Sequence, residues 1–153
     1  MRWLVAVVGR PRDAALAAAI HDYEARAARY WPLEVREVKG ERSAAMPPAE
    51  VRTREGERLS GAVKGSCVVA CDEGGRQFTS AAFATWLQRA REAGRDVAFV
   101  IGGAHGLEPS FVSGAQHRMA LAPWTLPHEL ARLVLAEQLY RAGTIVRGEP
   151  YHK

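Results

Sequence analysis

Short apolar runs alternate with amphipathic stretches along this chain of 153 residues. Two of the runs, Trp3 to Val8 and Val97 to Ile101, are typical of strands that are covered on both faces of a sheet. Ser66 to Cys71 is a third apolar run, and Leu33 to Val38 alternates imperfectly, which predicts a less buried or edge strand. Strands that alternate with helices predict an α/β class with a mainly parallel sheet, formed by a single domain over residues 1–153.

Helical spacing of apolar residues marks the segments between and after these strands. Asp13 and Ser80 are predicted N-caps, Thr125 is a possible cap for the last helix, and Gly94 and Gly143 are predicted to end helices. The predicted helices run from Asp13 to the break at Trp31-Pro32, from Glu50 to Val63, from Ser80 to Gly94, from Pro109 to about Val112, and from Pro127 to Gly143.

The composition is that of a globular protein with a mild basic bias, since the formal net charge is +4. This charge is compatible with a nucleic-acid partner but does not identify one. No apolar run is long enough to span a bilayer, and the short run after Met1-Arg2 does not resemble a secretory signal. Cys67 and Cys71 lie on one predicted strand, too far apart to form a disulfide, which predicts reduced thiols and a cytoplasmic protein. The scattered histidines show no metal-ligand spacing, so no metal site is expected.

The predicted helix from Glu50 to Val63 allows two interpretations. It carries Arg52, Arg54 and Arg58 among interleaved glutamates. These residues form either a solvated helix with i,i+4 ion pairs or an arginine face for RNA phosphate. The glutamates favour the first interpretation because they dilute the positive field.

Three segments converge on the carboxyl edge of the predicted sheet, where open α/β sheets bind ligands. They are Cys71-Asp72, the glycine loop 102–106 and the loop 122–127, which Pro123 and Pro127 stiffen. Glycines allow a ligand to approach the backbone closely, although Gly102-Gly103 alone is also compatible with a plain tight turn. The spacing matches neither a dinucleotide fingerprint nor a P-loop.

Three sequence stretches carry a resemblance to a known family. They are VIGGAHGL at 100–107, TLPHELARLVLAEQLYRA at 125–142 and the terminal PYHK, with VACDEGG at 69–75 as a further match. Over essentially its whole length the chain resembles the RlmH family of SPOUT methyltransferases. The resemblance implies a C-terminal trefoil knot, an exception to the usual unthreaded fold. It also implies a homodimer that uses S-adenosylmethionine to methylate N3 of a pseudouridine in a stem-loop of large-subunit (23S) ribosomal RNA.

The same resemblance implies which residues act. The cofactor is expected to bind in the knot, largely through backbone groups, with the active sites near the subunit interface. The terminal residues are expected to face the nucleotide. The implied cofactor contacts are Cys71 or Asp72, Gly103, Ala122, Pro123, Trp124, Thr125, Leu126 and Pro127.

The methyl donor is already electrophilic, so the enzyme mainly has to align the base nitrogen and remove a weakly acidic proton. His128, Glu129 and His152 are candidates for the proton acceptor, although water could also take the proton. Tyr151 could stack on the base, and Arg147, His152 and Lys153 could contact the RNA. Plain solvent exposure is the alternative interpretation for each residue of this tail.

The chain departs from the family pattern at two places. Ala104-His105-Gly106 stands where the family commonly has Pro-Glu-Gly, and Lys153 replaces the usual arginine. Two other functions stay open. One is a SPOUT methyltransferase that acts on another RNA such as tRNA, which the small size disfavours because no added RNA-binding domain is present, and the other is an RNA- or ribosome-binding protein that has lost methyl transfer through changes such as that at His105. Cofactor affinity separates the second from any methyltransferase.

Overall fold

The computed structural model describes residues 1–153 and contains one sheet of five strands, all parallel. The strand order is β2-β1-β4-β3-β5. The α/β class with a parallel sheet is therefore confirmed. In chain order the elements are β1 (Trp3–Val8), α1 (Ala14–Ala27), β2 (Leu33–Val38), α2 (Pro48–Ala62), β3 (Cys67–Gln77), α3 (Ser80–Glu92), β4 (Val97–Ile101), α4 (Pro109–Gly114), β5 (His117–Ala120), α5 (His128–Val146) and the 3-10 helix η1 (Pro150–His152).

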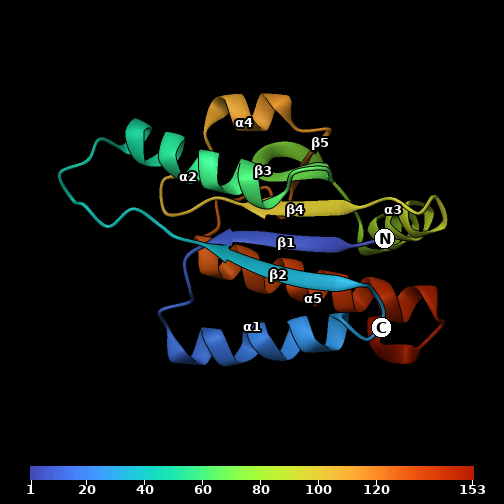
Figure 1. Ribbon diagram of the computed structural model, residues 1–153. Helices are drawn as coiled ribbons and strands as arrows, with labels where there is room; N and C mark the ends of the chain where they lie inside the picture. Colours follow the sequence, from blue (N-terminus) through green and yellow to red (C-terminus); the bar gives the residue numbers. More distant parts are fainter.

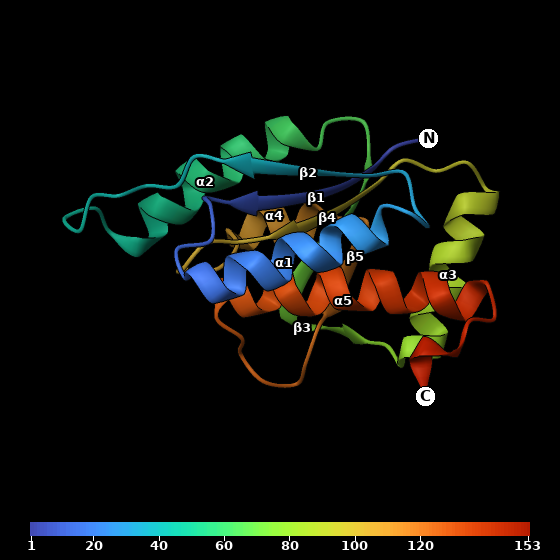
Figure 2. The same ribbon diagram turned by 90° about the horizontal axis from the view of Figure 1, so that it is seen from below.

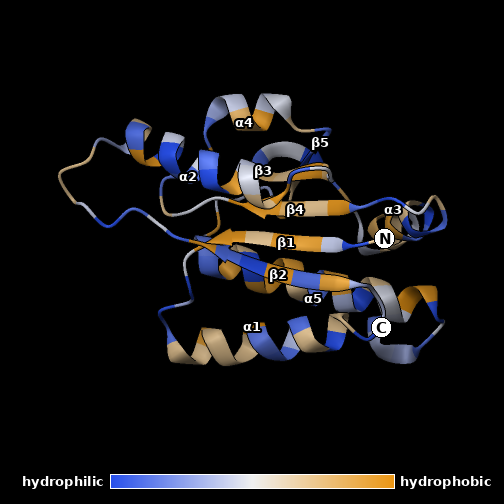
Figure 3. Cartoon of the chain, in the orientation of Figure 1, coloured by the Kyte–Doolittle hydropathy of each residue, from blue (hydrophilic) through white to orange (hydrophobic).

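The sheet is the middle of three layers (Figures 1 and 2). Helices α1 and α5 pack against each other on one face, and α3 crosses the C-terminal part of α5 (Figure 2). Helices α2 and α4 cover the other face. Strand side chains alternate between faces, so β1 contributes to both cores: Trp3 packs toward α1, α3 and α5, whereas Leu4 packs toward α2. Figure 3 shows the resulting apolar colouring of the central strands.

The two edges of the sheet differ in how well the sequence predicts them. β2 pairs with β1 alone and is half-buried, which confirms the predicted edge strand. β5 forms the opposite edge against β3 and was not predicted. Only Met119 and Ala120 of its four residues are buried. A four-residue strand with a polar first half is too short to give a recognisable alternation.

The predicted end of the last helix at Gly143 is wrong. Helix α5 continues to Val146, and Gly148 follows with a φ of 70°, the left-handed conformation typical of a helix terminator. Gly143 is a glycine for a different reason. A Cβ there would lie 2.4 Å from Cγ of Tyr30, so Gly143 allows α1 and α5 to approach closely.

Three of the predicted caps can be compared with the structure. Asp13 caps α1 as predicted, since its side chain accepts a hydrogen bond from Leu16 N at 2.9 Å. The prediction for Ser80 is wrong by one residue, because Thr79 is the N-cap and accepts from Ala82 N at 3.1 Å. Thr125 does not cap α5, whose N-cap is Pro127 without a side-chain hydrogen bond.

All five strands point the same way, so their carboxyl ends meet at one edge of the molecule, on the left in Figure 1. The connections after β1, β2, β3, β4 and β5 begin there. No helix of the protein has the length and apolar character needed to cross a bilayer.

Candidate functional site

A cavity of about 820 Å³ opens at this carboxyl edge. Its volume lies within the range of small-molecule sites. It is formed by the glycine loop after β4, the loop inside β3, the loop 121–127 and the starts of α2 and α5. The lining residues are Arg52, Cys71, Asp72, Glu73, Ile101, Gly102, Gly103, Ala104, His105, Gly106, Leu107, Pro109, Leu121, Ala122, Trp124, Thr125, Leu126, Pro127, His128 and Ala131.

The cofactor contacts expected from the sequence converge on this cavity, all except Pro123. The three segments lie far apart in the chain, and the parallel sheet brings them together because β3, β4 and β5 end at one edge. His128 also lines the cavity, whereas Glu129 does not. The cavity therefore joins the predicted binding residues with one candidate proton acceptor.

The glycine loop presents backbone to the cavity. Gly106 N donates to the Gly103 carbonyl at 3.0 Å, and Gly106 has a φ of 79°. A Cβ on Gly102 would lie 2.5 Å from the carbonyl carbon of Gly106, so the turn closes too tightly for any side chain there. The tight-turn interpretation and the binding interpretation are thus compatible, since the same turn forms the cavity wall.

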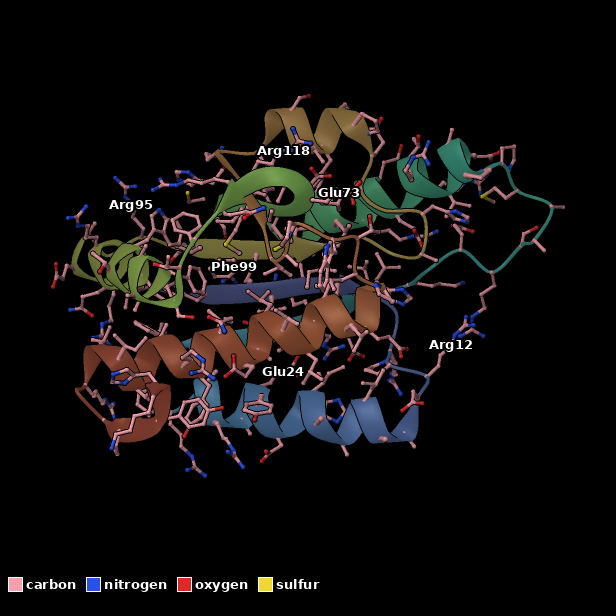
Figure 4. The ribbon with its side chains drawn as sticks, turned by 180° about the vertical axis from the view of Figure 1, so that it is seen from behind. Arg12, Glu24, Glu73, Arg95, Phe99 and Arg118 are labelled. Carbon is pink, nitrogen blue, oxygen red and sulfur yellow. The ribbon has the colours of Figure 1, made fainter.

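The loop inside β3 is held by Asp72. Its carboxylate accepts from Gly74 N at 2.9 Å and from Arg118 Nε at 2.7 Å, while Gly75 lies against the backbone of Met119. The pairing register with β5 shifts between Cys71 and Arg76, so the residues between them bulge out (Figure 4). The Asp72 carboxylate therefore shapes the loop and is already engaged by two partners.

The loop 121–127 forms the opposite wall. The Thr125 hydroxyl donates to the Glu73 carboxylate, which joins this loop to the β3 loop. Trp124 is 79% exposed, although it also lines the cavity. The Trp124 ring is therefore reachable both from solvent and from the cavity.

Cys71 lines the cavity as a thiol. Burial raises its pKa to about 12, and a hydrogen bond with the backbone of Val100 only partly opposes this. The group is therefore not a thiolate near neutral pH, which excludes it as a nucleophile. It contributes a neutral surface to the wall.

A buried arginine fixes the start of α5. Arg132 is 4% exposed, and its Nε donates to Glu24 Oε1 at 2.7 Å while its NH1 group donates to Glu37 Oε1 at 3.0 Å. Figure 4 shows Glu24 between α1 and α5. Burial alone would lower the pKa of Arg132. The hydrogen bonds and charges of Glu24 and Glu37 outweigh this effect, so the net pKa is raised and the guanidinium stays protonated. This triad holds α1, β2 and α5 together one turn from His128.

His128 and Glu129 differ in their freedom to act. His128 lines both the main cavity and a small neighbouring one formed with Gly9 and Arg10. Glu129 Oε1 accepts a hydrogen bond from Arg12 N at 2.5 Å and so anchors the loop after β1. Glu129 therefore anchors that loop, and of the two candidates for the proton acceptor only His128 lines the cavity.

The structure places the C-terminal tail away from the cavity of its own chain. Tyr151 packs on Tyr140 with ring centroids 4.5 Å apart, and its hydroxyl donates to Glu137 Oε1 at 3.1 Å. Arg147 lies over the ring of Tyr30, and neither it nor Tyr151, His152 or Lys153 lines the cavity. These residues lie at the far end of α5, whose 19 residues span about 27 Å.

Several cavity residues were missed from the sequence. Arg52 belongs to α2, whose arginines were expected to face solvent or RNA phosphate and not the cavity, and Leu107 and Leu121 lie just beyond the loops 102–106 and 122–127. Glu73 adjoins a predicted residue and could have been found from its place in the same polar turn. No cluster of three or more His, Cys, Asp or Glu side chains is arranged to hold a metal ion.

Comparisons with known proteins agree with this geometry. A family model described as predicted SPOUT methyltransferase matches residues 1–152. The chain is 61% identical over its full length, and the full length of the relative, to "Ribosomal RNA large subunit methyltransferase H" of Gemmatimonas aurantiaca. It is 48% identical, again over both full lengths, to a protein of the same name from an Anaeromyxobacter species.

A solved structure of a probable methylase family protein from Haemophilus influenzae superposes with a TM-score of 0.56. The sequence identity is 13%, and the match covers 99% of this chain and 70% of the other. At this identity the similarity concerns the fold, which agrees with the α/β architecture described above.

Proposed function

The chain belongs to the SPOUT methyltransferase family, and we propose that it transfers a methyl group from S-adenosylmethionine to N3 of a pseudouridine in large-subunit ribosomal RNA. The observation that carries the proposal is the cavity at the carboxyl edge, which gathers the positions that the family resemblance assigns to cofactor binding. The full-length relatives named ribosomal RNA large subunit methyltransferases support ribosomal RNA as the substrate. They also favour a cytoplasmic location, where ribosomes are found.

The cavity fits a nucleoside cofactor in its size and chemistry. Leu121, Leu126 and Ile101 give it apolar walls suited to a purine ring, and the glycine loop gives it a backbone edge for polar groups. Proline-bounded residues 123–127 are preorganised, which reduces the entropy lost on binding. When bound, S-adenosylmethionine supplies an electrophilic methyl group on a sulfonium sulfur.

The protein's own residues then have to orient the base and accept its proton. The imidazole of His128 can take the N3 proton, because it lies at the cavity wall beside the loops that would hold both reactants. His105 lines the same cavity from the glycine loop and can donate to a base carbonyl. It would thereby occupy the place of the glutamate that the family commonly has there.

We further propose that the active protein is a homodimer in which the tail of one subunit reaches the cavity of the other. The tail lies at the far end of α5 from its own cavity, so Tyr151, His152 and Lys153 can face the nucleotide only from a partner subunit. Trp124 and Leu130, both exposed near the cavity, are the apolar surface that such a partner would cover. The trefoil knot stays a prediction of the family resemblance.

The test of function uses ribosomes and total tRNA from cells that lack the protein, together with methyl-labelled cofactor. The proposal predicts label in the large-subunit RNA, recovered after digestion as a methylated pseudouridine. Label in tRNA would support the alternative substrate. Saturable cofactor binding without transfer to either RNA would contradict the proposal.

The dimer is tested by mixing two inactive variants, one with His128→Ala and one that ends at Gly148. Shared sites would restore activity in the mixed dimers, because one of the two sites then receives an intact cavity and an intact tail. Unchanged inactivity in verified mixed dimers would contradict a shared site.

A further inference from the structure

A segment beside the cavity projects beyond the edge of the sheet. It comprises the loop after β2 and the first half of α2, residues 39–54, and we call it the basic arm. Figure 1 shows it extending away from the carboxyl edge, farther than any other connection. Its base is fixed, since Arg58 NH1 donates to the Lys39 carbonyl at 2.8 Å and Glu41 N donates to Glu55 Oε2 at 3.2 Å. The arm thus extends from an anchored base next to the site.

The structure shows which charged side chains of this region are paired or buried and which are not. Arg54 pairs with Glu50 at 2.7 Å, Arg58 pairs with Glu41, and Glu55 is buried at 5% exposure. These glutamates, which dilute a positive face when the sequence alone is considered, are therefore occupied or hidden. The remaining glutamate of this helix, Glu57, lies about 140° around the helix axis from Arg52 by the helical repeat. The two side chains are therefore on different faces of α2.

The cations that remain lie at the carboxyl end of the sheet, where the cavity opens. Lys39, Arg42 and Arg52 form no salt bridge, and Arg52 itself lines the cavity. On the loop after β1, which Glu129 anchors next to His128, the Arg12 side chain is also exposed and forms no salt bridge. Figure 4 shows Arg12 at the end of the molecule from which the arm projects. Positive charge without a salt bridge therefore reaches the cavity at Arg52 and lies on two further loops at this end of the molecule.

We propose that the basic arm and Arg12 bind the phosphates of the nucleotides that flank the methylated base in a folded RNA. This inference rests on the proposed function, since it assumes that a nucleotide enters the cavity. Proteins hold structured RNA largely through phosphate and ribose contacts, because the bases of a helix are hard to read. Unpaired lysine and arginine side chains beside an opening of nucleotide size supply such contacts and fix the register of the RNA.

The test compares two double variants with the same change in charge. Lys39→Glu with Arg42→Glu reverses two arm cations that lie outside the cavity lining. Lys64→Glu with Arg89→Glu reverses two exposed cations, also without salt bridges, that lie near the opposite edge of the sheet. Affinity for a ribosomal RNA stem-loop is measured by fluorescence anisotropy over a salt series, with cofactor affinity measured in parallel.

The proposal predicts that the arm variant binds the RNA roughly tenfold more weakly near 0.1 M salt and that its salt slope falls by about 0.7 to 0.9 for each phosphate that the arm no longer neutralises. The control variant should bind almost as tightly as the wild type, and both variants should retain the wild-type affinity for cofactor. Equal RNA affinities of the two variants, in a background where the wild type methylates RNA, would overturn the arm proposal and leave the function intact. A wild type that transfers no methyl group would refute the proposed function instead, and the RNA affinities would still decide whether the arm binds phosphate.

Discussion

Gly103 lies directly against the buried carboxylate of Glu55. A Cβ at position 103 would be 2.9 Å from Glu55 Oε1 and 3.3 Å from Cγ1 of Val8. The glycine loop is thus packed from behind by α2, and Glu55 also accepts a hydrogen bond from Glu41 N at the base of the basic arm. The position of the cavity wall therefore depends on a helix that contributes only Arg52 to the lining.

Gly103→Ala is expected to weaken cofactor binding by roughly tenfold, because the new methyl group displaces the loop from Glu55 by a few tenths of an ångström. Calorimetric titration measures the loss. Glu55→Ala in the same chain removes the obstructing carboxylate and should restore part of the affinity. If the losses of cofactor affinity from Gly103→Ala and Glu55→Ala simply add in the double variant, the contact with Glu55 does not set the loop position.

The sequence alone was sufficient to place the loops that follow strands at one edge of the sheet. Cys71-Asp72, residues 102–106 and residues 122–127 could be placed at one edge because they follow apolar runs in an alternating α/β pattern, and the resemblance supplied their role. Arg52 and Glu55 could not be placed, because the side of α2 that meets the glycine loop depends on how α2 packs on β1. The pattern of apolar and polar residues within α2 does not predict how this helix packs on β1.

The two glycines near the end of α5 show the same limit. Gly143 and Gly148 are both compatible with a helix end in the sequence. Only the approach of Tyr30, in the turn after α1, shows that the first glycine is needed for packing, and only the positive φ shows that the second one terminates the helix. Similarly, nothing in the sequence of the tail showed that Tyr151 would pack on its own chain's α5.

Thr125→Val is expected to raise the cofactor Kd about fivefold. The change removes the hydroxyl that bonds to Glu73 but keeps the side-chain shape, and one such hydrogen bond is worth about 1 kcal/mol. The loss acts on binding because the bond joins two walls of the cavity. Thr125→Ser keeps the hydroxyl and should bind nearly like the wild type. Equal affinity of the valine variant would show that the two loops are held by other contacts.

Arg132→Leu is expected to lower the free energy of unfolding by about 2 to 4 kcal/mol. The change leaves Glu24, which is only 11% exposed, without its cation, and such uncompensated charges are costly. Denaturant unfolding measures the loss, with Arg54→Leu as the control because its pair with Glu50 is half exposed and should contribute under about 1 kcal/mol. Glu24→Gln added to Arg132→Leu should recover part of the loss. Similar losses for Arg132→Leu and Arg54→Leu would contradict a stabilising triad.

Cys71 is expected to resist thiol reagents in the folded protein. With a pKa of about 12, roughly one molecule in ten thousand is a thiolate at pH 8. A chromogenic disulfide reagent should therefore react with Cys71 only after denaturation. Mass spectrometry of the labelled peptide identifies the cysteine that has reacted. The raised pKa also stabilises the fold below about pH 8.5, where the unfolded thiol is still protonated, and this contribution is lost as the pH rises toward 12. Rapid labelling of folded protein at pH 8 would contradict the neutral thiol.

The central claim is that the cavity at the carboxyl edge binds the methyl donor, and calorimetric titration with S-adenosylmethionine tests it most directly. Ala122→Trp places a large side chain in the cavity from its wall. Ala93→Trp places the same side chain at an exposed site after α3, near the amino ends of the strands and away from the cavity. The account predicts saturable binding of one cofactor per chain in the wild type and in Ala93→Trp, and none in Ala122→Trp when that variant is folded. Absence of binding in the folded wild type, or unchanged binding in folded Ala122→Trp, would contradict it.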